Sequence, residues 1–291
     1  MALRGPPQDR SPADLLSFGV VNLDKPPGPS AHQVAAWVRD MAGVEQAAHA
    51  GTLDPKVTGC LPTLLGTATR MAQVFDDSVK EYVAVLELHG RAPNDFESIV
   101  AEFEGPIYQK PPRKSAVARR LRVREIHDLD VLEVEDRRAL LRVRCESGTY
   151  IRKLCHDVGL ALGTGAHMGH LRRTATGSFD DTTLRTLHDL ADALAVWRED
   201  DDASWLRDVV HPAERALVDF PHVTIAPSAA EQVAEGAPVY APGVIDVDGD
   251  PDRDDLVACF TPNDAAVCLG RYVGDPDGDS GLAVALERVL V

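Results

Sequence analysis

The stretch that most constrains this chain is HAGTLDPKVTGCLP, residues 49–62. It holds one carboxylate, Asp54, between Gly51, which frees the backbone ahead of it, and Pro55, which fixes the backbone behind it. Such a loop aims a side chain in one direction. An aspartate in a turn often serves only as a local hydrogen-bonding group or a helix cap, and the spacing alone leaves that interpretation open.

The chain is strongly acidic, with 46 Asp and Glu against 30 Lys and Arg and a formal net charge of -16. Only six of the basic residues are lysines, and acidic residues are crowded into segments such as 199–202 and 246–255. This composition is typical of proteins that stay soluble at high salt, where screening shortens the reach of a charge to a few ångströms. An ordinary acidic enzyme that never touches nucleic acid is equally compatible with it.

One segment, residues 105–124, breaks the acidic pattern, because it holds seven basic residues and no acidic one. A run of charge is often only a solvated face. Here prolines alternate with cations in an otherwise acidic protein, which favours an RNA-binding surface. We expect RNA contacts from Lys110, Arg113, Lys114, Arg119 and Arg120.

The five cysteines are scattered, and no two form a C-x-x-C pair. An odd number without a secretion signal predicts reduced, mostly buried thiols and gives no support for a zinc site, so we expect no metal. The sequence has no apolar run of about 18 residues and no signal-peptide pattern. These features predict a cytoplasmic protein that does not insert into a membrane.

Hydrophobic periodicity predicts an α+β chain that is long enough for two domains. Strands are expected at residues 18–23, 82–88, 121–134, 139–145 and 171–179, and helices at 31–42, 68–75, 95–103, 151–162 and 184–197. Ser30 is a suitable N-cap and Gly43 a suitable terminator for the first of these helices. Short apolar runs at 223–225, 256–260, 266–269 and 282–291, separated by turn residues, predict a small C-terminal β-barrel.

Arg152 is expected in the first turn of the helix that begins near Ile151, with Ser147 or Thr149 as its cap. A cation is poorly placed there, because the helix dipole favours anions at this end. A carboxylate partner would correct this, and Asp54 is the candidate.

Several ordered motifs carry a family resemblance. They are LDKPPGPS at 23–30, the Asp54 stretch, KEY at 80–82, IYQKPP at 107–112, SGTYIRKL at 147–154, GAHM at 165–168 and LRRT at 171–174. Together they resemble the TruB family of RNA pseudouridine synthases. The similarity is greater to the archaeal and eukaryotic dyskerin branch, the catalytic subunit of H/ACA ribonucleoproteins, and it covers roughly residues 16–245.

The resemblance implies a pseudouridine synthase fold, a mixed and mainly antiparallel sheet flanked by helices, at residues 16–215. Residues 216–291 resemble a PUA domain, a small β-barrel that binds RNA. Residues 1–15, rich in proline and charge, are expected to be a flexible extension or to drape over another part of the protein. The partners implied are tRNA, rRNA, H/ACA guide RNA and small H/ACA partner proteins.

The resemblance also implies an isomerase that needs no cofactor. Asp54 corresponds to the catalytic aspartate, Arg152 to the arginine that pairs with it, and Tyr82 to the aromatic residue that stacks on the uracil and is a candidate for proton removal. Without the resemblance, a tyrosine in a strand is usually core filling. The catalytic set is therefore Asp54, Tyr82 and Arg152.

Four further residues are expected to bind substrate. Tyr150 and Leu171 would line the pocket, and His49 would help to splay the target nucleotide out of its stack. Lys25 belongs to a motif that packs on the catalytic loop in the family. The sequence leaves two roles open for Lys25: it contacts RNA directly, or it is a solvated lysine beside a turn. Ala50 stands where this branch more often has glycine, a departure that concerns the loop and not the chemistry.

Three functions follow from these observations. The first is guided pseudouridylation of rRNA, together with activity on tRNA uridine 55. The second is a stand-alone synthase acting on the same tRNA uridine, and the third is a non-catalytic RNA scaffold, against which the complete catalytic set argues. The sequence does not identify the uridines modified, the first step at Asp54, the affinity for partners or the salt optimum.

Overall fold

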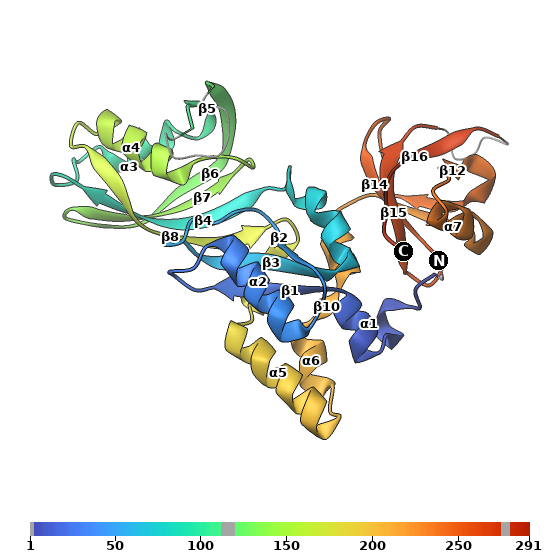
Figure 1. Cartoon of the computed structure of the whole chain (residues 1–291). Helices are drawn as coiled ribbons and strands as arrows, with labels where there is room; N and C mark the ends of the chain where they lie inside the picture. Colours follow the sequence, from blue (N-terminus) through green and yellow to red (C-terminus); the bar gives the residue numbers. More distant parts are fainter. Residues whose placement is uncertain (1–2, 112–119, 275–279) are drawn as a thin grey trace.

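The computed structural model describes residues 3–111, 120–274 and 280–291 (Figure 1). In these ranges a large mixed sheet fills the first part of the chain. Its strands are β1 Phe18–Lys25, β2 Ala47–His49, β3 Thr58–Gly66, β4 Lys80–Leu88, β5 Gly105–Gln109, β6 Arg122–Glu135, β7 Arg138–Cys145, β8 Ala166–Thr176, β9 Phe179–Asp180 and β10 His211–Pro212. The order is β10-β1-β3-β8-β4-β7-β6-β5, with β2 on β3 and β9 on β8. All pairs are antiparallel except β3 and β8, which confirms the expected α+β fold.

Helices cover this sheet in two groups (Figure 1). They are α1 Pro12–Ser17, α2 Ala31–Ala42, α3 Phe96–Ala101, α4 Ile151–Ala161, α5 Leu187–Asp200 and α6 Ser204–Val209, with 3-10 turns η1 Pro7–Asp9, η2 Thr67–Phe75, η3 Asp181–Thr183 and η4 Ala213–Leu217. Helices α2 and α5 contact one another beside β1 and β3, whereas α4 packs on β4 and β8. None of the helices in the described ranges is long and apolar enough to cross a membrane.

Helix α2 begins and ends where the sequence predicts. The Ser30 hydroxyl accepts a hydrogen bond from the Gln33 amide, and the Gln33 side chain accepts one from the Ser30 amide, a reciprocal capping box. Gly43 ends the helix with φ at 71°, a conformation that a residue with a Cβ adopts at a cost.

Other boundaries differ from the prediction. Residues 67–75 form a 3-10 helix in place of the expected α-helix, and the Thr69 hydroxyl donates to the Gly66 carbonyl, where it competes with α-helical bonding at the start of the segment. Neither Ser147 nor Thr149 caps α4: its N-cap is Tyr150, without a side-chain hydrogen bond, and the Thr149 hydroxyl donates to the Glu146 carbonyl instead. The strand expected at 171–179 begins earlier, at Ala166.

Two hydrophobic clusters meet in the middle of the sheet. One lies under α2 and α5 and contains Leu23, Val34 and Leu194; the other lies under α3 and α4 and includes Leu86 and Val158. The partly buried side chains of Tyr82 and Leu171 pack against both clusters. These two residues therefore stand where the halves of the sheet join.

The C-terminal part is a separate sheet of six strands among the described residues, in the order β12-β16-β15-β14-β11-β13. Its elements are β11 His222–Ile225, α7 Pro227–Ala234, β12 Val239–Tyr240, η5 Ala241–Gly243, β13 Val244–Asp248, β14 Leu256–Phe260, β15 Ala266–Tyr272 and β16 Leu282–Val289. Four of these strands were expected from the sequence, whereas α7 and the short β12 and β13 were not. All five cysteines of the chain are buried and free.

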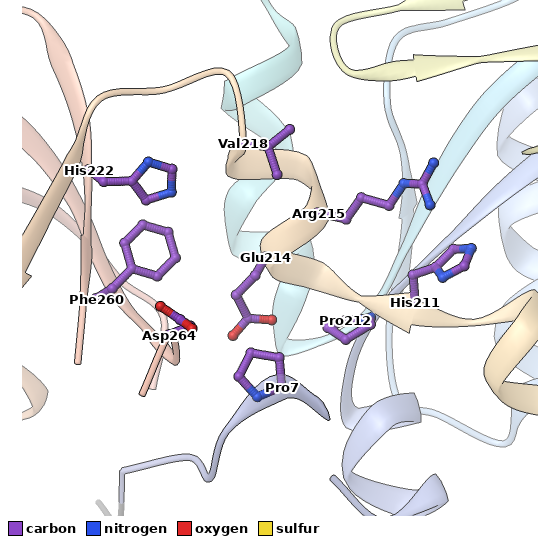
Figure 2. Close-up of a pocket in the computed structure, with 9 residues that line it drawn as sticks. All are labelled: Pro7, His211, Pro212, Glu214, Arg215, Val218, His222, Phe260 and Asp264. Carbon is purple, nitrogen blue, oxygen red and sulfur yellow. The ribbon is translucent and has the colours of Figure 1, made fainter. Parts of the chain in front are cut away.

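The first residues of the chain join the two sheets. Arg10, inside the predicted flexible extension, is 3% exposed and pairs with Glu214 at 2.6 Å. Glu214 also accepts a hydrogen bond from the Ala266 amide of the C-terminal sheet at 3.1 Å. A pocket of about 350 Å³ lies beside this contact, and Figure 2 shows Pro7 at the bottom of the view and His222, Phe260 and Asp264 at the left. Residues 3–15 thus contact both parts of the chain.

Candidate active site

The Asp54 loop connects β2 to β3 and is anchored on both sides of the aspartate. Leu53 and Val57 are each 4% exposed and belong to the hydrophobic core. The Val57 amide donates to the Asp54 carbonyl at 3.0 Å, which closes a tight turn. With its neighbours held in the core, the Asp54 side chain is directed outward and is 53% exposed.

Arg152, the second residue of α4, forms an ion pair with Asp54 through Nη2 and Oδ2. The Arg152 side chain is 52% exposed, so both partners can be reached from solvent. The structure thus brings together the two residues whose pairing the sequence predicts. The carboxylate also offsets the unfavourable position of a cation at the start of a helix.

Tyr82 lies on β4, opposite Arg173 of β8. Leu171 is two residues before Arg173 and shares its face of the sheet, so it adjoins Tyr82. Burial raises the pKa of the Tyr82 hydroxyl, while the charge of Arg173 and its hydrogen bond to the tyrosine oppose this shift. The ring is held against the core with its hydroxyl next to a cation.

Tyr150 precedes α4, and its main chain is tied to β5. Its amide donates to Gln109 Oε1 at 2.9 Å, and Gln109 Nε2 donates to its carbonyl at 3.3 Å. Arg152 is thereby connected to the strand that leads into the basic segment. In that segment Lys110 and Arg120 are exposed. Arg113, Lys114 and Arg119, also predicted to bind RNA, lie outside the described residues.

Lys25 is not a solvated lysine beside a turn. Its side chain is fully buried, and Nζ donates to the carbonyls of Pro26, Pro55 and Val57 at 2.8–3.0 Å. Two of these carbonyls belong to the Asp54 loop. Lys25 therefore supports the loop from below.

His49 lies at the start of the loop, half-buried beside His32 of α2. Its Nε2 is 3.3 Å from His32 Nδ1, and the two rings meet edge to face. Burial, with contributions from His32 and Arg173, lowers the pKa of His49 to about 4. The imidazole is therefore uncharged at neutral pH and presents an aromatic surface next to the loop.

Two buried cations escaped prediction. Arg173 is 1% exposed and Lys80 is 5% exposed, and both lie beneath the Asp54 loop. The signal was present for Arg173, because residues two apart in a strand share a face and Leu171 was predicted to face the pocket. Arg172 lies on the opposite face and makes two parallel hydrogen bonds of 3.0 Å with Asp24.

The site is open. The pocket at the domain junction and a second one bordered by Ser17, Gln46 and Arg70 contain none of the predicted catalytic residues. A carboxylate and a guanidinium on an exposed surface, with an aromatic ring nearby, suit a large substrate that brings one small group to the carboxylate.

Comparison with known proteins identifies the family of the chain. Four family models match: the DKCLD (NUC011) domain at residues 5–35, the N-terminal domain of TruB family pseudouridylate synthases at 39–95 and 91–151, the C-terminal domain of tRNA pseudouridylate synthase B at 152–218 and the PUA domain at 221–277. The Asp54 loop and Tyr82 lie within the second match, and Arg152 begins the third. The fold and the site therefore define a pseudouridine synthase, which is an isomerase.

Similar proteins agree along nearly the whole chain. A "Probable tRNA pseudouridine synthase B" of Haloarcula marismortui is 68% identical over 297 residues, covering 100% of this chain and 94% of the relative. One of Pyrococcus abyssi is 45% identical over 294 residues, covering 99% and 88%. The chain belongs to the TruB family of pseudouridine synthases.

Solved structures place the chain in the archaeal, dyskerin-like branch of that family. Cbf5 in a Cbf5-Nop10-Gar1 complex superimposes with a TM-score of 0.94 at 45% identity, covering 99% of this chain and 90% of that one. A chain of an H/ACA RNP bound to a substrate RNA containing 2'-deoxyuridine superimposes with a TM-score of 0.92 at 43% identity, covering 99% of this chain and 90% of that one. The DKCLD match at residues 5–35 agrees with this placement.

Proposed function

We propose that this protein isomerises uridine to pseudouridine in RNA as the catalytic subunit of an H/ACA-type ribonucleoprotein, and that it also acts on uridine 55 of tRNA. The observation that carries the proposal is the Asp54–Arg152 pair on an open surface of a TruB-family chain. The likeness to Cbf5 in complexes with Nop10, Gar1 and RNA supports guided activity. The sequence relatives, named as probable tRNA pseudouridine synthases, support activity on tRNA.

The reaction breaks the bond between uracil N1 and ribose C1′ and forms one between C5 and C1′. The C5 proton leaves, N1 gains a proton, and the composition is unchanged. The ionised Asp54 meets the target nucleotide, and Arg152 orients that carboxylate by a charge-assisted hydrogen bond. Tyr82 stacks on the uracil and is placed for the late proton removal at C5.

The other residues bind and position the nucleotide. The uncharged ring of His49 occupies the space that the base leaves as it is splayed from its stack. Leu171 and Tyr150 flank the base, and Lys25 keeps the loop in place from below.

RNA follows the basic segment, through Lys110 and Arg120 and through Arg113, Lys114 and Arg119 outside the described residues. The PUA domain grips the ACA end of the guide RNA, and the large sheet docks the small partner proteins. The site of action is the cytoplasm.

The test compares two substrates for the same protein. The protein alone is incubated with an unmodified tRNA transcript, and then with an rRNA fragment, with and without a matching H/ACA guide RNA and the small partner proteins. Carbodiimide-dependent primer extension reports pseudouridine at single positions. We expect product on the rRNA only with guide and partners, and product at the T-loop uridine of the tRNA without them.

The outcomes separate the candidate functions. Product on tRNA alone, with none on guided rRNA, would select the stand-alone synthase. Binding of both RNAs without product would select the scaffold and overturn the proposal.

A further inference from the structure

Arg173 joins β8 to the Asp54 loop from inside the protein. Its Nε donates to the Cys60 carbonyl at 2.7 Å, and Nη2 donates to the carbonyls of Ala50 and Gly51 at 3.1 and 3.3 Å. These three acceptors lie on both sides of Asp54 in the chain. The planar guanidinium therefore fixes the two ends of the loop relative to each other.

The packing around Arg173 is close. A Cβ added to Gly51 would lie 3.2 Å from Arg173 Nη1, and one added to Gly59 would lie 2.2 Å from the Arg173 carbonyl. Both glycines also have positive φ angles, 80° and 98°. The loop is thus pressed onto the arginine, and its backbone has little room to shift.

Lys80 makes the corresponding connection to the segment that carries Arg152. Its Nζ donates to the carbonyls of Phe75 and Ser78 at 2.6 and 2.7 Å, and its contacts with the hydroxyls of Ser78 and Ser147 are each 3.0 Å. Ser147 lies in the short loop between β7 and α4, five residues before Arg152. Lys80 therefore anchors the start of that loop to the end of η2.

The two cations are neighbours. Lys80 and Tyr82 share one face of β4, and Arg173 is opposite Tyr82, so all three side chains point the same way. Neither cation forms an ion pair with a carboxylate among the described residues, and their acceptors are carbonyls and hydroxyls. Burial, and next the charge of Arg173, lowers the pKa of Lys80 to about 8. Burying two like charges side by side costs free energy that a stability role alone does not require.

We propose that Arg173 and Lys80 are positioning residues for this reaction, which together hold Asp54, Arg152 and Tyr82 in their relative places. The inference rests on the proposed function, because it concerns the same site. Arg173 fixes the aspartate loop and the tyrosine, and Lys80 fixes the loop leading to the arginine. Displacement of a reacting group by about 1 Å can lower a rate by about 100-fold.

Their burial also suits an acidic protein adapted to salt. Surface charges are screened within a few ångströms at high ionic strength, whereas charges without solvent contact are screened far less. Salt therefore does not weaken the contacts by which these two cations hold the catalytic groups in place.

The test uses Arg173→Lys, which keeps the charge but loses the planar guanidinium with its several N–H donors, and Ser147→Ala, which removes only the hydroxyl that Lys80 contacts. Arg142→Lys is the matched control, since Arg142 is an exposed strand arginine paired with Asp130 at 2.9 Å. Single-turnover rate constants at saturating RNA, RNA dissociation constants and melting curves are measured for each, on whichever RNA the wild-type protein modifies. Rates are expressed per folded molecule.

We expect the Arg173→Lys rate to fall about tenfold or more, and the Ser147→Ala rate to fall about threefold. RNA dissociation constants should stay within about twofold of wild type, and the control should match wild type in every measurement. Wild-type rates per folded molecule in both variants would overturn the inference, as would failure of both to fold, because the cations would then be stability elements only. If the wild-type protein itself made no pseudouridine, the proposed function would fail instead.

Discussion

The two sides of the Asp54 loop are built differently. The outer side carries Asp54 and Arg152, two side chains about half exposed that neutralise one another. The inner side rests on Lys25 and Arg173, two buried cations that donate to main-chain carbonyls of the loop and its flanks, Arg173 also contacting the Tyr82 hydroxyl. An exposed pair can exchange partners when a nucleotide arrives, whereas a buried cation bound to carbonyls keeps a fixed geometry.

This difference separates the contributions to activity and to stability. An exposed ion pair contributes about 0–1 kcal/mol to folding, so the outer pair can be altered with little effect on the fold. Removing a buried donor leaves its acceptors unsatisfied, at about 1–3 kcal/mol for each group. Substitutions on the outer side should therefore affect turnover, and substitutions on the inner side should affect stability as well.

Apart from substitution of Asp54 itself, the largest effect is expected on the outer side, from Arg152→Lys. The charge remains, but the guanidinium that orients the Asp54 carboxylate is lost. We expect the single-turnover rate to fall about 10- to 100-fold, with the melting temperature nearly unchanged. Near-normal turnover would show that Arg152 is not the orienting partner. The expectation that outer-side substitutions affect turnover would then fail for this residue.

On the inner side, Lys25→Met should lower the free energy of unfolding by about 3 kcal/mol. The Pro26 and Val57 carbonyls lose their donor, while the Pro55 carbonyl keeps the Gly28 amide at 2.8 Å. Denaturant titration at constant salt measures the loss. The matched control is Lys56→Met, an exposed lysine on the same loop, which should change stability by less than about 0.5 kcal/mol. Equal effects for the two would contradict the supporting role of Lys25.

An effect confined to acidic pH is expected from the edge of the loop, in the pH dependence of stability. His49 binds its proton only near pH 4 in the folded protein, against about 6.5 in the unfolded chain. Between these values the unfolded state binds more protons, so stability should fall as pH decreases from about 6.5 to 4. In His49→Gln this part of the pH dependence should disappear. The exposed His188 provides the control, and His188→Gln should follow the wild-type curve.

The sequence predicted the parts of the molecule that depend on local pattern. Helix α2 and its two caps follow from Ser30 and Gly43, and the β6–β7 hairpin follows from alternation on either side of a charged turn. The pairing of Asp54 with Arg152 followed from the helix dipole and was strengthened by the family motifs. These features need only residues that are close in sequence or motifs that are specific.

The sequence did not reveal what lies under the loop. The family motif placed Lys25 against the loop, but lysines are usually exposed, and only the structure, with β1 paired to β3, shows that its side chain is enclosed. The contacts of Arg173 and Lys80 depend on the meeting of two strands and three loops; strand alternation indicates the face on which Arg173 lies, but it does not indicate the acceptors of either cation. Helical periodicity also does not separate a 3-10 helix from an α-helix at residues 67–75, where the Thr69 hydroxyl donates to the Gly66 carbonyl.

The central claim, that the Asp54 carboxylate carries the chemistry, is tested most directly by pseudouridine formation in Asp54→Asn, a variant of nearly the same shape without the charge. On an RNA that the wild-type protein modifies, the account predicts a rate at least about 10³-fold lower, with RNA affinity within about twofold and melting unchanged. Pseudouridine formed by this variant at a rate near that of wild type would contradict it.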